Sequence, residues 1–281
     1  MYHLLRTPGE HILEVKDAGP KDGRPLLLFH GFGGSASAFP TEHLQGAGVR
    51  LVVLNRPGTG ASTPRPFTVA TLAAEARWVL EQLGIGTVQA GGWAAGAVYA
   101  LAFAQAYPAL VTGLHLLAPA LPGGDPEARP LLPGARSMAG RIERLLPAAR
   151  RWRFRSIARA LAADPDRVLR HRASDLPEAD QRIALSLEWR DLLLHSATEG
   201  YSHDGAGVQA DRAALDAARI DWKAIGAPVR IWSGDADNVW PAASTAWLRD
   251  RLPHSEWKTV AGAGHFFYLP QWASFLASLP S

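Results

Sequence analysis

Gly91-Gly92-Trp93-Ala94-Ala95-Gly96 joins a predicted strand to a predicted helix. The strand ends near Gly91, and a small-residue pattern typical of a helix continues to Tyr107. Small residues stand two positions before and two positions after Ala94, which is the spacing of the nucleophile elbow G-x-S-x-G. In that motif the middle residue lies in a strained turn where only small neighbours fit. Alanine carries no nucleophilic group, so the stretch alone also fits a glycine-rich turn without a catalytic role.

Short apolar runs and helical patterns alternate on both sides of this turn. The sequence predicts strands at residues 25–30, 49–55, 87–91, 113–118, 228–233 and 257–261, and helices at 68–83, 95–107, 241–252 and 267–279. Strands that are apolar throughout and alternate with helices are typical of a parallel sheet covered on both faces. We therefore predict the α/β class.

The pattern changes between residues 121 and 225. A loop rich in proline and glycine comes first, and about ninety residues with helical patterns and no convincing strand follow. A simple connection between two strands needs far fewer residues. We predict a core formed by residues 1–120 and 226–281, with a helical cap inserted at 121–225. Within the cap, Ile183, Leu187 and Leu194 predict an apolar stripe on one helix that also carries Trp189.

Three further motifs directly follow predicted strands. Residues 30–34, His-Gly-Phe-Gly-Gly, let the backbone turn sharply and direct an N–H group where it can stabilise an oxyanion. Residues 234–237, Gly-Asp-Ala-Asp, supply a carboxylate, and residues 262–265, Gly-Ala-Gly-His, supply an imidazole. A carboxylate can fix the tautomer of an imidazole and stabilise its cation. Position 94, Asp237 and His265 follow the Ser, Asp, His order of one known enzyme fold.

With these motifs, nearly the whole chain resembles the α/β-hydrolase fold superfamily. The resemblance implies a mostly parallel eight-stranded sheet, with the helical cap between strands six and seven. It implies these site residues: Ala94 at the nucleophile position, Asp237 as the acid, His265 as the base, and the N–H groups of Phe32 and Ala95 as the oxyanion hole. Asp235 is the alternative acid, but the superfamily's Gly-x-x-Asp spacing favours Asp237.

Ala94 departs from the pattern of the superfamily. One explanation is an engineered Ser→Ala substitution, and the other is a natural pseudo-enzyme. The intact Asp237 and His265 favour the first, because a site without selection tends to lose its other parts. An ancestral Asp nucleophile is disfavoured, because the haloalkane dehalogenases and epoxide hydrolases usually place Trp after that residue, whereas this chain has Ala95.

The expected activity is hydrolysis of an ester, lactone, amide or related acyl bond by a Ser-Asp-His triad in the parent form, with this chain inactive. Two alternatives stay open. One is a C–C hydrolase, lyase or acyltransferase on the same scaffold. The other is a ligand-binding protein that keeps the pocket and lacks the nucleophile. The expected partner is a small acyl substrate, and the sequence leaves its identity and the oligomeric state undetermined.

Four aromatic residues are candidates for the substrate pocket. They are Trp93, beside the elbow, and Trp152, Trp189 and Tyr201 in the predicted cap. Aromatic residues in such helices more often pack on the core than line a pocket, so packing is the favoured interpretation for the three cap residues.

The composition excludes several classes of protein. The chain has 281 residues, no cysteine, and 29 Lys and Arg against 26 Asp and Glu, and the net charge of +3 is too small to indicate nucleic-acid binding. The histidines show no metal-binding spacing, so we expect neither metal nor cofactor. No apolar run reaches the roughly 18 residues of a membrane span. The N-terminal residues lack a signal-peptide pattern, and we expect a cytoplasmic protein.

Arginine is concentrated in one part of the predicted cap. Residues 136–172 contain eleven arginines and three acidic residues. The favoured interpretation is the solvated face of amphipathic helices, and the alternative is a basic lid that attracts an anionic substrate or surface.

Overall fold

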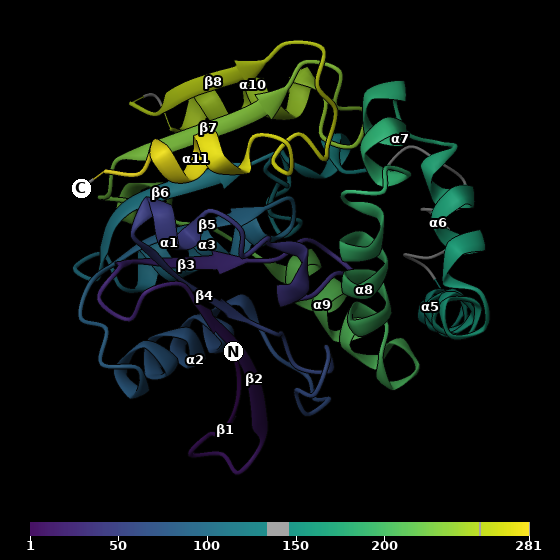
Figure 1. Ribbon diagram of the computed structural model, residues 1–281, viewed down its shortest axis with the longest axis horizontal. Helices are drawn as coiled ribbons and strands as arrows, with labels where there is room; N and C mark the ends of the chain where they lie inside the picture. The colour runs from purple at the N-terminus through teal and green to yellow at the C-terminus, as the bar shows by residue number, and fades with distance from the viewer. Residues whose placement is uncertain (134–145, 253, 281) are drawn as a thin grey trace.

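A computed structural model describes residues 1–133, 146–252 and 254–280. Its centre is an eight-stranded sheet in the order β1-β2-β4-β3-β5-β6-β7-β8 (Figure 1). The strands are β1 (Tyr2–Arg6), β2 (Ile12–Ala18), β3 (Arg24–Phe29), β4 (Val49–Leu54), β5 (Val88–Trp93), β6 (Val111–Leu117), β7 (Val229–Gly234) and β8 (Glu256–Val260). β2 is antiparallel to both β1 and β4, and all other neighbours are parallel. This sheet confirms the α/β class and the mostly parallel arrangement that the resemblance implied.

Alternate residues of the central strands face opposite layers of helices. Leu27 and Phe29 of β3 belong to one apolar cluster, together with α2 (Val69–Gln82) and α3 (Gly96–Ala106). Leu26 and Leu28 belong to the other cluster, with α1 (Leu44–Ala47) and α11 (Trp272–Ala277). α10 (Ala242–Arg251) packs on Trp257 of β8. Both faces of the sheet are therefore covered, which explains why its central strands are apolar throughout.

All six strands predicted from apolar runs are present, with ends that differ by no more than two residues. The apolar runs did not indicate β1 and β2, because charged residues such as Arg6 and Lys16 interrupt the apolar residues of these strands. The helix expected over 267–279 is shorter than predicted. Turns occupy residues 266–271 before α11 begins at Trp272.

The helices that follow β6 and precede β7 in the chain lie together, beside the carboxyl ends of the strands (Figure 1). They are α5 (Pro147–Ala163), α6 (Pro165–Ala173), α7 (Glu178–Ala184), α8 (Arg190–Gly200) and α9 (Ala206–Ala217). We refer to them as the cap helices. Their exact boundaries with the core stay a prediction.

The prediction that one helix carries Ile183, Leu187 and Leu194 is wrong. A turn separates α7 from α8, and the Leu187 side chain in this turn is 97% exposed. The hydroxyl of Ser186 donates to the carbonyl of Ile183 at 2.8 Å and accepts from the N–H of Trp189 at 3.2 Å. This local side-chain bonding offers the backbone an alternative to helix and ends the pattern.

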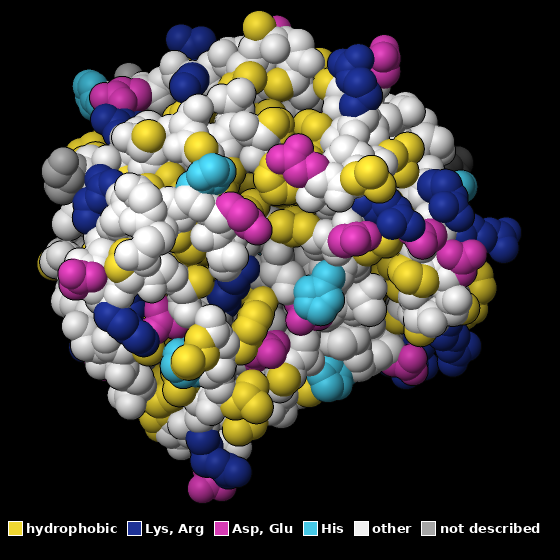
Figure 2. Space-filling view, in the orientation of Figure 1, with side chains coloured by type: hydrophobic (Ala, Val, Ile, Leu, Met, Phe, Trp, Pro, Cys, Tyr) yellow, Lys and Arg dark blue, Asp and Glu magenta, His cyan; other side chains and the backbone are white. Residues whose placement is uncertain are grey.

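The described arginines of the cap helices are mostly exposed. Figure 2 displays basic side chains, interspersed with acidic ones, over the region of α5 and α6. The exposed members are Arg151, Arg153, Arg155, Arg159, Arg167, Arg170 and Arg172. They fit the interpretation of a solvated face. Arg136, Arg141 and Arg144 lie outside the described residues.

Candidate active site

Ala94 lies in a strained turn at the end of β5, in the centre of the sheet. Its φ angle is +51°, in the left-handed region that residues other than glycine rarely adopt. The turn is held on both sides, because the N–H of Ala94 donates to the carbonyl of Leu117 at 2.9 Å and its carbonyl accepts from the N–H of Ala97 at 3.0 Å. The backbone therefore fixes the direction of whichever side chain stands at position 94.

The glycines around Ala94 are required by the packing of this turn. A Cβ atom at Gly96 would lie 1.8 Å from the carbonyl oxygen of Phe29, and one at Gly92 would lie 2.2 Å from the carbonyl carbon of Gly96. Phe29 ends β3, where it pairs with Gly92 of β5. The small-residue frame seen in the sequence thus lets the elbow approach the neighbouring strand.

Asp237 and His265 meet beyond the ends of β7 and β8. The Oδ2 atom of Asp237 lies 2.9 Å from the Nδ1 atom of His265, and both side chains are buried. The other carboxylate oxygen accepts from the N–H groups of Val239 at 2.8 Å and Trp240 at 3.0 Å. With Nδ1 donating to the carboxylate, the Nε2 atom of His265 retains its lone pair. This geometry suits an imidazole that acts as a base.

Asp235, the alternative acid, points elsewhere. It is exposed, and its Oδ1 atom accepts from the N–H of Gly262 at 2.7 Å. The structure therefore brings Asp237 to the imidazole, and Asp235 closes the turn between the two loops.

A carboxylate from the cap holds the histidine loop. The Oδ2 atom of Asp180, in α7, accepts from the N–H of His265 at 2.6 Å, and its Oδ1 atom accepts from the N–H of Phe266 at 2.7 Å. Asp180 is fully buried, and burial raises the pKa of its carboxyl group while the two N–H groups oppose that rise. A Cβ atom at Gly264 would lie 2.1 Å from this carboxylate. Sequence reasoning missed Asp180, because a lone aspartate in a helix carries no motif.

The backbone N–H groups of Phe32 and Ala95 are available as donors. Neither has a hydrogen-bond acceptor among the described residues. Arg56 holds the turn that carries Phe32. Its guanidinium donates to the carbonyls of His30 at 2.7 Å and Gly31 at 2.8 Å. Free N–H groups on a fixed backbone are what an oxyanion hole requires.

Arg56 is itself held by the cap. It lies 2.7 Å from the Oδ2 atom of Asp211 in α9, and the hydroxyl of Tyr99 donates to the other oxygen of Asp211 at 2.5 Å. Arg56 and Asp211 are both buried. Burial raises the pKa of the Asp211 carboxyl group, and Arg56 opposes that rise. This buried network connects the turn below Phe32 to α3 and α9.

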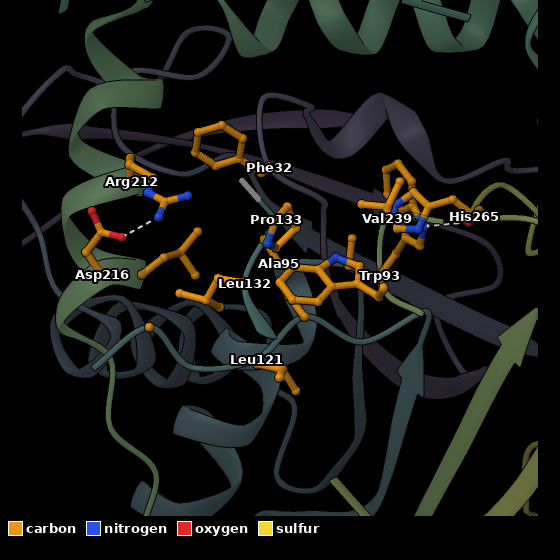
Figure 3. Close-up of a pocket in the computed structure, with 15 residues that line it drawn as sticks. Phe32, Trp93, Ala95, Leu121, Leu132, Pro133, Arg212, Asp216, Val239 and His265 are labelled. Carbon is orange, nitrogen blue, oxygen red and sulfur yellow. Dashed lines mark hydrogen bonds and ion pairs between the residues drawn. The ribbon is translucent and has the colours of Figure 1, made fainter. Parts of the chain in front are cut away.

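A cavity of about 270 Å³ opens above the elbow (Figure 3). Ala94 belongs to its lining, and Figure 3 shows His265 at one end and Arg212 and Asp216 of α9 at the other. The other lining residues are apolar or glycine: Phe32, Trp93, Ala95, Ala120, Leu121, Gly123, Leu132, Pro133, Leu215, Val239 and Trp240. The arrangement can hold a small, largely apolar molecule against the imidazole.

Residues 24–271 match the sequence profile of the alpha/beta hydrolase fold family. The chain belongs to this family. Across 97% of its length, this α/β-hydrolase is 26% identical to a proline iminopeptidase of Neisseria gonorrhoeae, 92% of which is covered. Its fold is similar to that of a carboxylesterase structure from Nitrososphaera gargenis, with a TM-score of 0.71, 20% identity and 98% of both chains covered. It is also similar to an esterase from Thermogutta terrifontis, with a TM-score of 0.69, 22% identity, and coverage of 98% of this chain and 95% of the other.

Of the four aromatic residues proposed for the pocket of this α/β-hydrolase, one lines the cavity. Trp93 lines the cavity, and its indole N–H donates to the carbonyl of His265 at 3.1 Å. Trp152 does not reach the cavity, because it is on the outer face of α5 and is 72% exposed. Trp189 packs against an apolar cluster that contains Leu193 of α8 and Trp272 of α11, and the ring of Tyr201 packs against that of Phe154. None of the three cap residues lines this cavity, and a role for them in substrate binding stays a prediction.

Sequence reasoning missed the cavity residues that follow Asp237 and those on α9. Val239 and Trp240 are adjacent to the acid motif, so proximity in the chain was a usable signal. Among the described residues of the α/β-hydrolase, no group of three or more His, Asp or Glu side chains could hold a metal ion. In the same part of the chain, no helix has the length and apolar character needed to cross a membrane.

Proposed function

We propose that this α/β-hydrolase has the site of a serine hydrolase in which Ala94 occupies the nucleophile position. Asp237 is the acid, His265 is the base, and the N–H groups of Phe32 and Ala95 form the oxyanion hole. One observation carries the proposal: Ala94, in a strained left-handed turn, shares a cavity with an imidazole that Asp237 holds at 2.9 Å.

A serine at position 94 would complete the reaction. Its hydroxyl attacks the carbonyl carbon of the substrate, and the Nε2 atom of His265 takes the hydroxyl proton. The oxyanion accepts hydrogen bonds from Phe32 and Ala95, and His265 then gives its proton to the leaving group. A water molecule, deprotonated by His265, releases the acid and restores the serine. The products are the acid and an alcohol or amine.

The chain with Ala94 lacks the attacking oxygen and keeps the other groups. We therefore expect it to bind acyl substrates and to turn them over roughly 10⁶-fold more slowly than its serine form, as when the nucleophile of a triad is removed. The alanine is either an engineered replacement or a natural one. The codon at position 94 of the native gene distinguishes these origins.

The similarity to a proline iminopeptidase supports hydrolytic chemistry and adds amides of proline to the substrates worth testing. The identity of 26% leaves the substrate open, so esters, lactones and amides remain in the proposal. A ligand-binding protein is the second candidate, and the observation that favours it is Ala94 itself. A C–C hydrolase, lyase or acyltransferase would use the same imidazole and oxyanion donors.

The test compares the chain with its Ala94→Ser variant on p-nitrophenyl esters, lactones and aminoacyl amides. We expect hydrolysis by the variant and none above background by the chain with Ala94. The control is Ala94→Ser combined with His265→Ala, which should abolish the gain. If the Ala94→Ser variant remains inert while the chain binds a small ligand tightly, the ligand-binding function becomes the better account.

A further inference from the structure

We propose that the end of the cavity opposite His265 binds a negatively charged group of the substrate, and that Arg212 contacts this group. The substrate class is then an acyl compound with a carboxylate, or a comparable anion, at the far end of a short apolar acyl chain. This inference rests on the proposed function for the reacting end of the substrate.

Helix α9 places two charged side chains at the end of an otherwise apolar cavity. Arg212 and Asp216 are four residues apart, so they share one face of the helix. Figure 3 shows the Arg212 side chain directed from α9 toward the cavity, the Asp216 carboxylate turned toward Arg212, and His265 on the opposite side. Among the described residues that line the cavity, Arg212, Asp216 and His265 are the only titratable ones.

The charges at this end do not cancel. The Oδ1 atom of Asp216 lies 2.6 Å from Arg212, and its Oδ2 atom lies 2.9 Å from Arg150 of α5. Two guanidinium groups thus face one carboxylate, which leaves a net charge of +1 among these three residues. Both oxygens of Asp216 are engaged, so a cationic amine could bind this carboxylate only by displacing a guanidinium.

Arg212 has the chemistry to hold a carboxylate. A guanidinium presents five N–H donors, more than one carboxylate can accept, and the Nη2 atom of Arg212 lies 2.6 Å from Asp216. Its side chain is 38% exposed, so the charge is not buried when the cavity is empty. Apolar walls such as Leu215 and Phe32 lower the local dielectric constant and strengthen an Arg–carboxylate contact.

The distribution of polar groups defines the shape of the substrate. The imidazole of His265 lies at one end of the cavity and the guanidinium of Arg212 at the other, and most of the remaining lining is apolar (Figure 3). A substrate that fits both ends of the cavity has its reactive carbonyl and its anion at opposite ends of an apolar spacer. The cavity volume of about 270 Å³ restricts that spacer to a short one.

The experiment measures binding to the chain with Ala94, which does not require turnover. Calorimetry compares three p-nitrophenyl esters of similar length: the monoester of glutaric acid, which is anionic; its neutral methyl ester; and the ester of 4-(trimethylammonio)butyric acid, which is cationic and has no amine that could attack the ester. We expect the anionic ester to bind roughly 10- to 100-fold more tightly than the neutral one, as for a hydrogen bond between charged groups. The cationic ester should bind most weakly.

Variants assign the preference to Arg212. Arg212→Gln should remove the preference for the anion and leave the affinity for the neutral ester unchanged, which also reports that the variant is folded. Asp216→Asn should increase the preference, because it frees both guanidinium groups. The matched control is Arg77→Gln, which removes an exposed pair with Glu81, also four residues apart, in α2. It should change none of the affinities.

Two results would overturn the proposal. One is an affinity for the cationic ester that equals or exceeds the affinity for the anionic ester. The other is an equal loss of affinity for all three esters in a folded Arg212→Gln variant. If Arg212→Gln does not fold, Asp216→Asn decides the matter, because an unchanged preference in that variant also overturns the proposal. Failure of the proposed function is a separate result. In that case Ala94→Ser hydrolyses none of the esters, while the binding preference of the chain with Ala94 still reports on Arg212.

Discussion

The buried carboxylate of Asp180 accepts a hydrogen bond from the backbone N–H of His265 at 2.6 Å. Asp180 belongs to cap helix α7, and His265 belongs to the loop after the last strand of the core. A second bond, to the N–H of Phe266, makes the contact bidentate. The position of the imidazole therefore depends on the docking of a cap helix as well as on Asp237.

Replacing Asp180 should impair the Ala94→Ser enzyme more in kcat than in KM. In Asp180→Asn the amide N–H₂ group would face one of the two N–H donors, so one hydrogen bond is lost and the loop shifts. We expect kcat to fall by about 10- to 100-fold, as for a misplacement of about 1 Å. The dependence of kcat on pH should also differ from that of the Ala94→Ser enzyme, because the loop that carries the imidazole has moved. The control is Asp191→Asn in α8, a side chain that is 85% exposed. Unchanged kcat and an unchanged pH profile in a folded Asp180→Asn variant would refute this positioning role.

Arg56 should position the turn that carries Phe32. In the Ala94→Ser background, Arg56→Met should lower kcat, and it should lower the free energy of unfolding by about 3 to 5 kcal/mol, because Asp211 is left buried and unpaired. Adding Asp211→Leu should recover much of the stability by removing that charge. It should not recover kcat, because the carbonyls of His30 and Gly31 still lack their donor. Full activity in the double variant would show that Arg56 serves stability alone.

His115 gives a prediction that does not depend on the enzymatic proposal. Burial lowers the pKa of His115 to about 4, so between pH 4 and 6.5 the unfolded chain binds more protons than the folded chain. The free energy of unfolding should therefore rise with pH across this window, by about 3 kcal/mol at most, and the whole gain should be lost once the pH has fallen from 6.5 to 4.

Unfolding by guanidinium chloride at several pH values measures the contribution of His115 to the free energy of unfolding. His115→Gln should flatten the rise, whereas His195→Gln should leave it intact, because the His195 side chain is 65% exposed. An equal slope in the chain and in His115→Gln would contradict the assignment.

Local patterns predicted the sheet and the loops at its carboxyl edge. Each motif directly follows a strand: the elbow follows β5, Asp237 follows β7 and His265 follows β8. Parallel strands end at one edge of the sheet, so the topology alone brings such loops together. The close approach of the elbow to β3 also depends on a feature visible in the sequence, because a Cβ atom at Gly96 would lie 1.8 Å from the carbonyl oxygen of Phe29.

The contribution of the cap could not be predicted in the same way. Whether Trp152 or Phe154 of α5 faces inward depends on how that helix docks, and the structure exposes the first and buries the second. Asp180 contacts a loop 85 residues further along the chain, and Arg212 lines a cavity whose other residues come from distant segments. Single charged residues in helices give no signal of such placement. The break after Ala184 depends on one serine hydroxyl that competes with the helix.

Covalent labelling tests the central claim, which is that position 94 is the nucleophile position of a site that is otherwise complete. The Ala94→Ser protein would be incubated with a fluorophosphonate, digested and analysed by mass spectrometry. The account predicts one phosphonyl group per chain, on the serine introduced at position 94, and loss of this labelling when His265→Ala is added. If that serine stays unlabelled, or if labelling persists without His265, the claim is contradicted.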